Sequence, residues 1–155
     1  GLLEKAEGPD EVAGVLAHEL AHVEHRHIMT QIVRGTILSA LWAATVGDYT
    51  GLMVVDPSVA YNLGMRRFGR DDEREADRAA LATLDAAGVS GAGLAAFFQR
   101  LQSKTDRVPA FLSTHPSSAE RARTITTGAP TRSTTPALPP DSWTALRTAC
   151  TKPKP

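Results

Sequence analysis

Two histidines and a glutamate form the densest group of chemically useful side chains in the sequence, in the run His18-Glu19-Leu20-Ala21-His22. Because His18 and His22 lie four residues apart, both imidazoles extend from one face of a helix and can reach the same metal ion. Zinc accepts such nitrogen ligands in a tetrahedral shell. Glu19 points about 100° away around the helix, where it can serve as general base for a zinc-activated water. The run therefore predicts a hydrolytic zinc site.

A helix has to carry this motif, and the sequence marks its start at Gly8-Pro9, since proline suits the first helical position. An apolar stripe follows at helical spacing and comprises Val12, Leu16, Leu20 and Val23. The two histidines lie on roughly the opposite side. We therefore expect a central helix that is buried on both sides. Gly14, one turn before His18, is expected to leave room beside the metal.

A second acidic segment, residues 71–88, is expected to supply the third ligand. It predicts a helix that ends near Gly88, a common residue type after a helix C-terminus. Its buried face, read from the spacing, consists of Glu73, Asp77, Ala80 and Leu84. Buried carboxylates are costly unless they are paired or bound to metal. We expect Glu73 to bind zinc and Asp77 to accept a hydrogen bond from a ligand histidine.

An acidic first turn, favoured by the helix dipole, is the alternative explanation of this segment. It accounts well for Asp71 and Asp72, but not for two carboxylates on the apolar stripe. Glu75 lies about 200° around the helix from Glu73 and should face solvent. His25 shares the histidine face, but one straight helix cannot bring it to the ion with the other two. We interpret His25 and His27 as supporting or surface residues.

Taken together, these segments resemble the gluzincin family of zinc metalloproteases, which includes the CAAX prenyl protease, HtpX, BepA and a mitochondrial inner-membrane quality-control protease. The resemblance covers residues 2–150. It uses H-E-x-x-H, the E-x-x-x-D run 73–77, the pair Arg26-His27 that continues the active-site helix, and Ser113-Thr114-His115-Pro116 followed by Glu120-Arg121. It implies a zinc metalloendopeptidase with one Zn²⁺ held by His18, His22 and Glu73.

His115 and Arg121 gain a catalytic role through this resemblance. It implies that they either stabilise the oxyanion of the tetrahedral intermediate or that the histidine coordinates the resting metal; chemistry allows both. Pro116 is expected to begin a helix with His115 at its cap. From the residues alone, a capping histidine and a surface arginine explain the pattern as well.

The expected fold is that of an α+β zincin-like catalytic domain. Because little of its sheet belongs to this chain, we expect a mainly α structure. In it the H-E-x-x-H helix packs against the E-x-x-x-D helix. We assign residues 1–127 to the catalytic domain, 128–140 to a Thr/Pro-rich linker and 141–150 to a short helix that packs on the domain. Ser90 is expected to cap another helix, with a buried face of Leu94, Phe97, Phe98 and Leu101. The apolar run 37–55 is interrupted by Asp48, which favours a core or interfacial helix over a membrane span.

The chain has 17 basic and 17 acidic residues, which argues against a nucleic-acid groove. Its one cysteine, Cys150, excludes an intrachain disulfide. The expected partners are polypeptide substrates, and family analogy indicates quality control in the bacterial envelope, periplasmic or membrane-associated. We expect this chain to be a fragment or processed product. Membrane association would then come from a segment outside it. A latent or chaperone-like zinc-binding protein is the alternative, and a closed fourth metal position would favour it.

Overall fold

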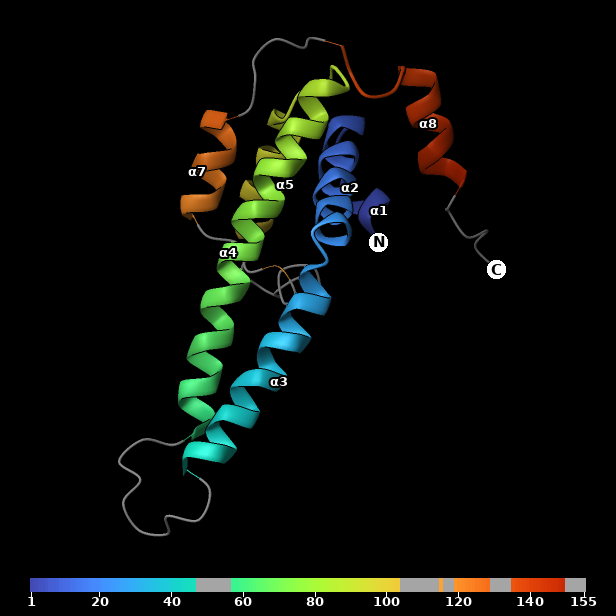
Figure 1. The fold of residues 1–155 in the computed structure, drawn as a ribbon. Coiled ribbons are helices and arrows are strands. Elements are labelled where there is room, and N and C mark those ends of the chain that lie inside the picture. Colours follow the sequence, from blue (N-terminus) through green and yellow to red (C-terminus); the bar gives the residue numbers. More distant parts are fainter. Residues whose placement is uncertain (47–56, 104–114, 116–118, 129–134, 150–155) are drawn as a thin grey trace.

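The computed structural model describes residues 1–46, 57–103, 115, 119–128 and 135–149. All of the regular elements in these ranges are helices, which confirms the mainly α expectation. Their bounds are α1 Leu2–Lys5, α2 Pro9–Glu24, α3 His27–Val46, α4 Pro57–Ala86, α5 Ala92–Ser103, α7 Ala119–Gly128 and α8 Pro140–Ala149. Helices α2, α5 and α7 gather around one end of α4, while α3 runs beside the other end (Figure 1).

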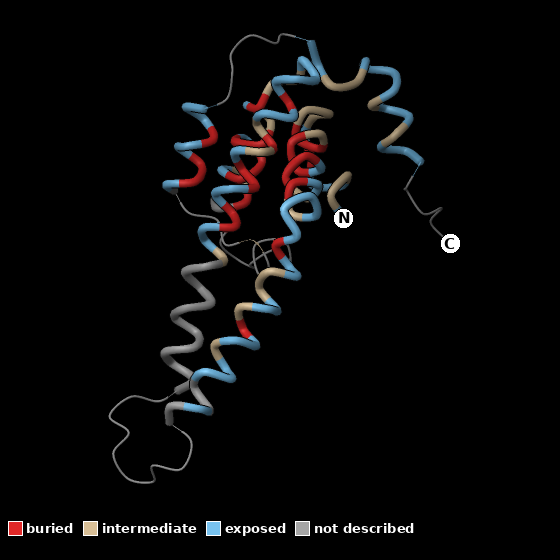
Figure 2. Tube along the Cα trace, in the orientation of Figure 1, coloured by how far each residue is buried: buried red, intermediate tan, exposed pale blue. Residues whose placement is uncertain are grey.

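The core lies where α2, α4, α5 and α7 meet, as the buried segments in Figure 2 show. The α5 face predicted from the sequence is confirmed, because its four apolar residues, Leu94, Phe97, Phe98 and Leu101, are all buried. Ser90 accepts a hydrogen bond from the backbone N–H of Ala92 at 3.2 Å, so it supports the start of α5 as expected. Helix α2 is tied to α5 by the carboxylate of Glu11, which accepts hydrogen bonds of 2.5 Å from both terminal nitrogens of Arg100.

Helix α2 starts at Pro9, as predicted, but its orientation differs from the expectation. Of the apolar stripe only Val12 is buried; Leu16 and Leu20 are each 57% exposed and Val23 is 71% exposed. The buried side is instead the histidine side, with Val15, His18 and Ala21. Helix α2 thus turns its histidine side towards α4 and its larger apolar residues outward. The expectation of burial on both sides is wrong for the described residues.

Gly14 serves helix packing, and the predicted role beside the metal is wrong. A Cβ atom at this position would lie 2.8 Å from the Cβ of Leu94 in α5, which is closer than packed carbon atoms approach. On the facing helix, a Cβ at Gly93 would lie 2.5 Å from the backbone carbon of Asp10. The two glycines therefore let α2 and α5 cross in close contact.

Gly14→Ala is expected to destabilise the fold by about 1–3 kcal/mol, because the extra methyl group forces the two helices apart. Gly69→Ala is the matched control, since a Cβ there meets nothing within 4 Å and alanine is the better helix former by about 1 kcal/mol. Urea unfolding of both variants measures the difference. Equal stability of Gly14→Ala and wild type would contradict this packing role.

Helix α4 ends as predicted, with Gly88 at a positive φ of 69° just beyond it. It begins at Pro57, however, well before Asp71. Asp71 and Asp72 therefore lie inside a long helix, and the explanation of these residues as an acidic first turn is wrong. Asp72 is buried and accepts hydrogen bonds from Gln31 at 2.9 Å and Arg34 at 3.3 Å, so it joins α4 to α3.

Helix α3 contains the start of the apolar run at 37–55, and residues 47–56 lie outside the described residues. Ile37 is 60% exposed and Leu41 is 57% exposed, so these side chains are not part of the described core. Among the described residues no helix combines the length and the apolar character that a bilayer span requires.

The C-terminal part of the chain forms the predicted short helix, α8. None of its residues is buried, and it stands apart from α4, α5 and α7 in Figure 1. A hydrogen bond of 2.6 Å from the backbone N–H of Ala137 to Asp10 links the segment before α8 to α2. The packing of α8 on the domain and the boundaries 1–127, 128–140 and 141–150 stay predictions, and residues 129–134 of the linker lie outside the described residues.

Candidate metal centre

The site begins on the buried face of α2. His18 is fully buried, and the side chain of His22 is 10% exposed. Their Nε2 atoms lie 3.1 Å apart, so both imidazoles point to one place, as the four-residue spacing predicts. Phe98 of α5 packs edge-on against His18, with ring centroids 5.8 Å apart, and helps to hold the ring.

Helix α4 brings Glu73 to the same place, as the predicted buried stripe requires. Oε2 of Glu73 lies 3.4 Å from His18 Nε2, and Oε1 lies 3.4 Å from His22 Nε2. Glu73, Asp77, Ala80 and Leu84 are all buried, which confirms the predicted face. Glu75 lies on another side of the helix with its side chain 51% exposed, also as expected.

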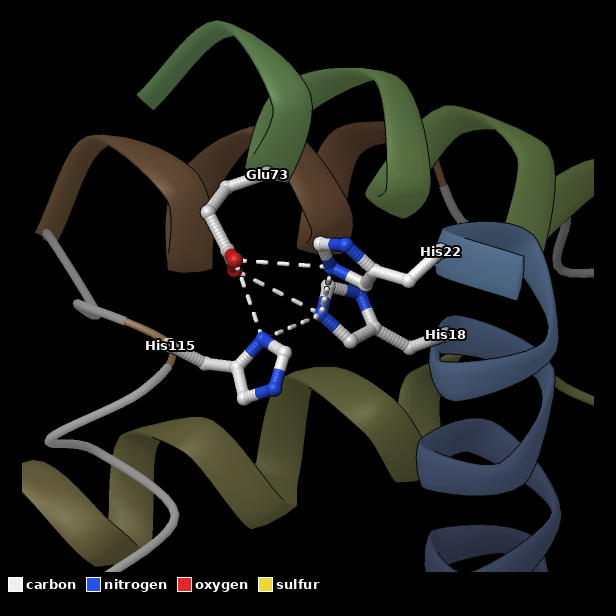
Figure 3. A group of neighbouring side chains, drawn as sticks. All are labelled: His18, His22, Glu73 and His115. Atoms are coloured by element: carbon white, nitrogen blue, oxygen red, sulfur yellow. Dashed lines mark hydrogen bonds and ion pairs between the residues drawn. The ribbon is translucent and has the colours of Figure 1, made fainter. Parts of the chain in front are cut away.

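His115 is the fourth member of the group, and Figure 3 shows it facing Glu73 and the two α2 histidines. Its Nδ1 lies 2.9 Å from Oε1 of Glu73 and 3.4 Å from His18 Nε2. Pro116 and the segment before His115 lie outside the described residues, and α7 is described from Ala119. The predicted cap role of His115 therefore stays a prediction.

The spacing of these four donors fits one zinc ion. Zinc bonds of about 2.0–2.1 Å in a tetrahedral shell place neighbouring ligand atoms roughly 3.3 Å apart. The donor pairs described above are separated by 2.9 to 3.4 Å. Three imidazoles and a carboxylate are ligands that zinc binds readily, whereas calcium and magnesium prefer oxygen. These donors therefore have both the chemistry and the spacing of a zinc site.

Asp77 and Arg121 lie behind the four donor residues rather than among them. Oδ1 of Asp77 lies 3.0 Å from Nδ1 of His18. Arg121 donates to both oxygens of Asp77, at 2.7 and 2.8 Å, and its Nη1 lies 2.7 Å from Oε2 of Glu73. Both residues are buried, so a surface role for Arg121 is excluded. The pair thus contacts His18 and Glu73 on the side away from the point where the donors converge, as residues that orient metal ligands do.

The environment keeps the carboxylates ionised. Burial opposes charge on Glu73, but hydrogen bonds with His115 and His18, together with the Arg121 guanidinium, outweigh it and lower the pKa of Glu73. Burial also opposes charge on Asp77, but the hydrogen bonds from Arg121 and His18 lower its pKa. An ionised Glu73 is the form that binds a cation.

His18 and His22 differ electrostatically. Burial lowers the pKa of His22 to about 4, and the nearby His18 acts in the same direction, so His22 is neutral at pH 7, the form of imidazole that can bind a metal. Burial also disfavours charge on His18, but its hydrogen bonds to Asp77 and Glu73 outweigh that effect and raise the pKa of His18.

Glu19 extends from the solvent-facing edge of the group. Its side chain is 44% exposed, and Oε1 lies 3.3 Å from Nε2 of His115. It is thus beside the four donors without belonging to them. This location suits general-base chemistry, because the carboxylate is open to water and to an incoming substrate.

His27 lies closer to the site than we expected of a supporting or surface residue. Helix α2 ends at Glu24, Arg26 adopts a left-handed backbone with φ 54°, and α3 begins at His27. The expected continuation of the active-site helix through Arg26-His27 is therefore wrong. His27 is 2% exposed, and its Nδ1 lies 2.9 Å from Nδ1 of His22. In the sequence, the only signal for this contact was the Arg26-His27 pair shortly after the motif.

A helical domain in which an H-E-x-x-H helix and an E-x-x-x-D helix join at a zinc-type ligand group is the arrangement of a gluzincin metallopeptidase. Residues 1–129 match the sequence profile of peptidase family M48. The chain belongs to this family.

Several curated proteins are similar to the chain. It is 32% identical over 143 residues to a candidate beta-barrel assembly-enhancing protease of Vibrio cholerae, a match that covers 79% of this chain and 30% of that protein. It is 34% identical over 123 residues to the metalloprotease LoiP of Escherichia coli, covering 75% and 48%. It is 32% identical over 131 residues to the mitochondrial metalloendopeptidase OMA1 of Schizosaccharomyces pombe, covering 81% and 38%.

The matches to these three relatives thus span between 30% and 48% of each relative's length. No solved structure shows a significant match to the chain.

Proposed function

We propose that the chain is the catalytic domain of a zinc metalloendopeptidase that holds one Zn²⁺ through His18, His22 and Glu73. The supporting observation is the common point at which their donor atoms converge, with separations of 3.1 to 3.4 Å. The M48 membership and the metalloprotease names of LoiP and OMA1 support the same proposal.

A zinc ion held by these three residues would supply a Lewis acid to polarise the peptide carbonyl and activate water. Glu19 takes the proton of the attacking water and passes it to the leaving amine. Asp77 holds the Nδ1 side of His18, so that Nε2 faces the metal. Arg121 keeps Asp77 and Glu73 ionised and in place, and its engagement with both carboxylates favours this positioning role over direct contact with the oxyanion.

His115 is proposed as the residue that closes the site at rest. Its Nδ1 lies within ligand spacing of Glu73 and His18, so a neutral His115 can occupy the fourth zinc position in place of water. Its Nε2 also lies 3.3 Å from the carboxylate of Glu19, the proposed general base. Both contacts oppose hydrolysis until a substrate displaces the ring. This observation also favours the second candidate function, a latent zinc-binding protein.

His115→Ala is expected to raise basal cleavage of an unfolded substrate and to weaken zinc binding, because one ligand is lost while the water position opens. Peptide turnover and zinc affinity are measured on the same preparation. A lower kcat with unchanged zinc affinity would instead assign His115 to oxyanion stabilisation. If neither quantity changes, both roles are wrong.

The natural substrates are proposed to be misfolded or unassembled polypeptides of a bacterial envelope. The proposal follows the names of the relatives, which include a beta-barrel assembly-enhancing protease and a mitochondrial metalloendopeptidase. Metal analysis of the purified protein, followed by casein cleavage with and without a chelator, tests the enzymatic activity. Bound zinc without chelator-sensitive cleavage, in wild type and in His115→Ala, would support the latent alternative and contradict the peptidase proposal.

A further inference from the structure

The two proposed ligand histidines of α2 differ in the group that contacts their Nδ1 atoms, on the side of the ring away from the proposed zinc. A histidine that binds zinc through Nε2 carries its ring proton on Nδ1, and that N–H is normally oriented by an acceptor. For His18 the acceptor is a carboxylate, Asp77, 3.0 Å away. For His22 the atom 2.9 Å from Nδ1 is Nδ1 of another histidine, His27.

The proton positions along this chain of side chains follow from valence. If His22 Nδ1 donates, Nδ1 of His27 must accept, so a neutral His27 carries its own proton on Nε2. Nε2 of His27 lies 3.3 Å from Oε2 of Glu75, and a carboxylate accepts there. The side chain of His27 is only 3% exposed. Because water has little access to its ring, Glu75 and His22 determine its tautomer.

We infer that His27 and Glu75 form an outer support of the metal centre, in which the Glu75 carboxylate orients His22 through the imidazole of His27. They are positioning residues, and the inference builds on the proposed zinc site. The arrangement extends the usual carboxylate–histidine–metal unit by one imidazole. His18 has the direct form of the unit through Asp77, and His22 has the extended form.

The backbone break at Arg26 makes the contact available. On an uninterrupted helix, His27 would lie five residues after His22 and about 140° around the axis, so the two rings would diverge. The left-handed residue, with φ 54°, ends α2 and starts α3 in a new direction. His27 is then the first residue of α3 and its ring packs against His22, with centroids 4.7 Å apart.

A second cation is the rival explanation for these residues. Donor atoms of His25, His27 and Glu75 lie within 4.8 Å of one another and could hold an ion of their own. A cation on Nε2 of His27 requires that nitrogen to be unprotonated. A neutral His27 would then carry its proton on Nδ1 and could not accept from His22. The two explanations are therefore mutually exclusive and predict different zinc stoichiometries.

The test compares zinc binding of the complete chain in Glu75→Ala, His27→Asn and Asp71→Ala. Glu75→Ala removes the final acceptor at a half-exposed helix position that tolerates alanine. His27→Asn keeps an acceptor oxygen near the position of Nδ1. Asp71→Ala is the matched control, because it removes the same charge from the same helix at a side chain that is 52% exposed and forms an ion pair with Arg74.

Zinc affinity is measured by chelator competition. Glu75→Ala is expected to weaken zinc binding about 10–100-fold, the usual effect of losing an outer-shell partner, with one zinc still bound per chain. His27→Asn should lose less zinc affinity than Glu75→Ala, and the zinc affinity of Asp71→Ala should match that of wild type. The thermal stability of the zinc-free Glu75→Ala protein should equal that of zinc-free wild type. If Glu75 had a general structural role instead, the thermal stability of the zinc-free variant would fall below that of zinc-free wild type.

Nitrogen NMR of the imidazoles gives a second readout. Wild type with zinc should show a slowly exchanging Nδ1–H proton on His22, and Glu75→Ala should exchange it faster. Wild-type affinity in Glu75→Ala would overturn the inference while leaving the zinc site intact. A second equivalent of zinc that disappears in Glu75→Ala would overturn it in favour of the rival cation. If wild type binds no zinc at all, the proposed function fails first, and the inference fails with it.

Discussion

Glu19→Gln is expected to lower kcat/KM for peptide cleavage by at least about 10²–10⁴-fold, the usual cost of losing a general base. The amide keeps the size and the hydrogen-bonding capacity of the carboxylate but cannot take the proton of the attacking water. Because Glu19 is 44% exposed and is not one of the four converging donors, zinc content and thermal stability should not change.

The measurement is single-turnover cleavage of an unfolded protein or a fluorogenic peptide, with zinc content determined on the same sample. Glu24→Gln is a suitable control, since it removes one carboxylate near the end of the same helix. If Glu19→Gln retained activity within a few-fold of wild type, another group would have to act as the base.

Glu73→Gln is expected to abolish stable zinc binding. The substitution removes the only anionic ligand of the proposed set and leaves an amide beside Nη1 of Arg121, which now lies 2.7 Å from the carboxylate. The loss in affinity should exceed the about 10–100-fold effect typical of outer-shell substitutions. His18→Ala and His22→Ala should behave in the same way, because each removes one of the converging donors.

Metal content after dialysis against a weak chelator measures this effect, and Asp71→Asn provides the matched control on α4. Undiminished zinc in Glu73→Gln would show that another residue supplies the third ligand. Comparison with Glu75→Ala separates a ligand from a positioning residue. The Glu73→Gln protein should lose the metal, whereas the Glu75→Ala protein should still bind it, but more weakly.

The sequence predicted the parts of the site that depend on local geometry. Spacing of four residues places His18 and His22 on one helix face whatever surrounds the helix. The same periodicity places Glu73 and Asp77 on the buried side of α4, since a stripe that continues through Ala80 and Leu84 has to face the core. The apolar face of α5 followed from the same rule.

Other features could not be read from periodicity because they depend on which helix packs where. The α2 stripe of Leu16, Leu20 and Val23 is as periodic as a core face, yet it is exposed, because the histidine side of the helix faces α4. The role of Gly14 became apparent only from the position of Leu94 on α5. Arg121 could be interpreted as a surface residue until α7 placed it against two buried carboxylates.

The sequence by itself determined the proposed ligand types, the helices that carry them and the zinc chemistry they favour, because covalent spacing and helix geometry act within one element. Only the tertiary structure decided which residues support those ligands. Asp77 meets His18, and Glu75 meets His27, through contacts between α2, the start of α3 and α4. The position of His27 follows from one left-handed residue, Arg26, and the sequence gives no signal for this conformation, which non-glycine residues seldom adopt.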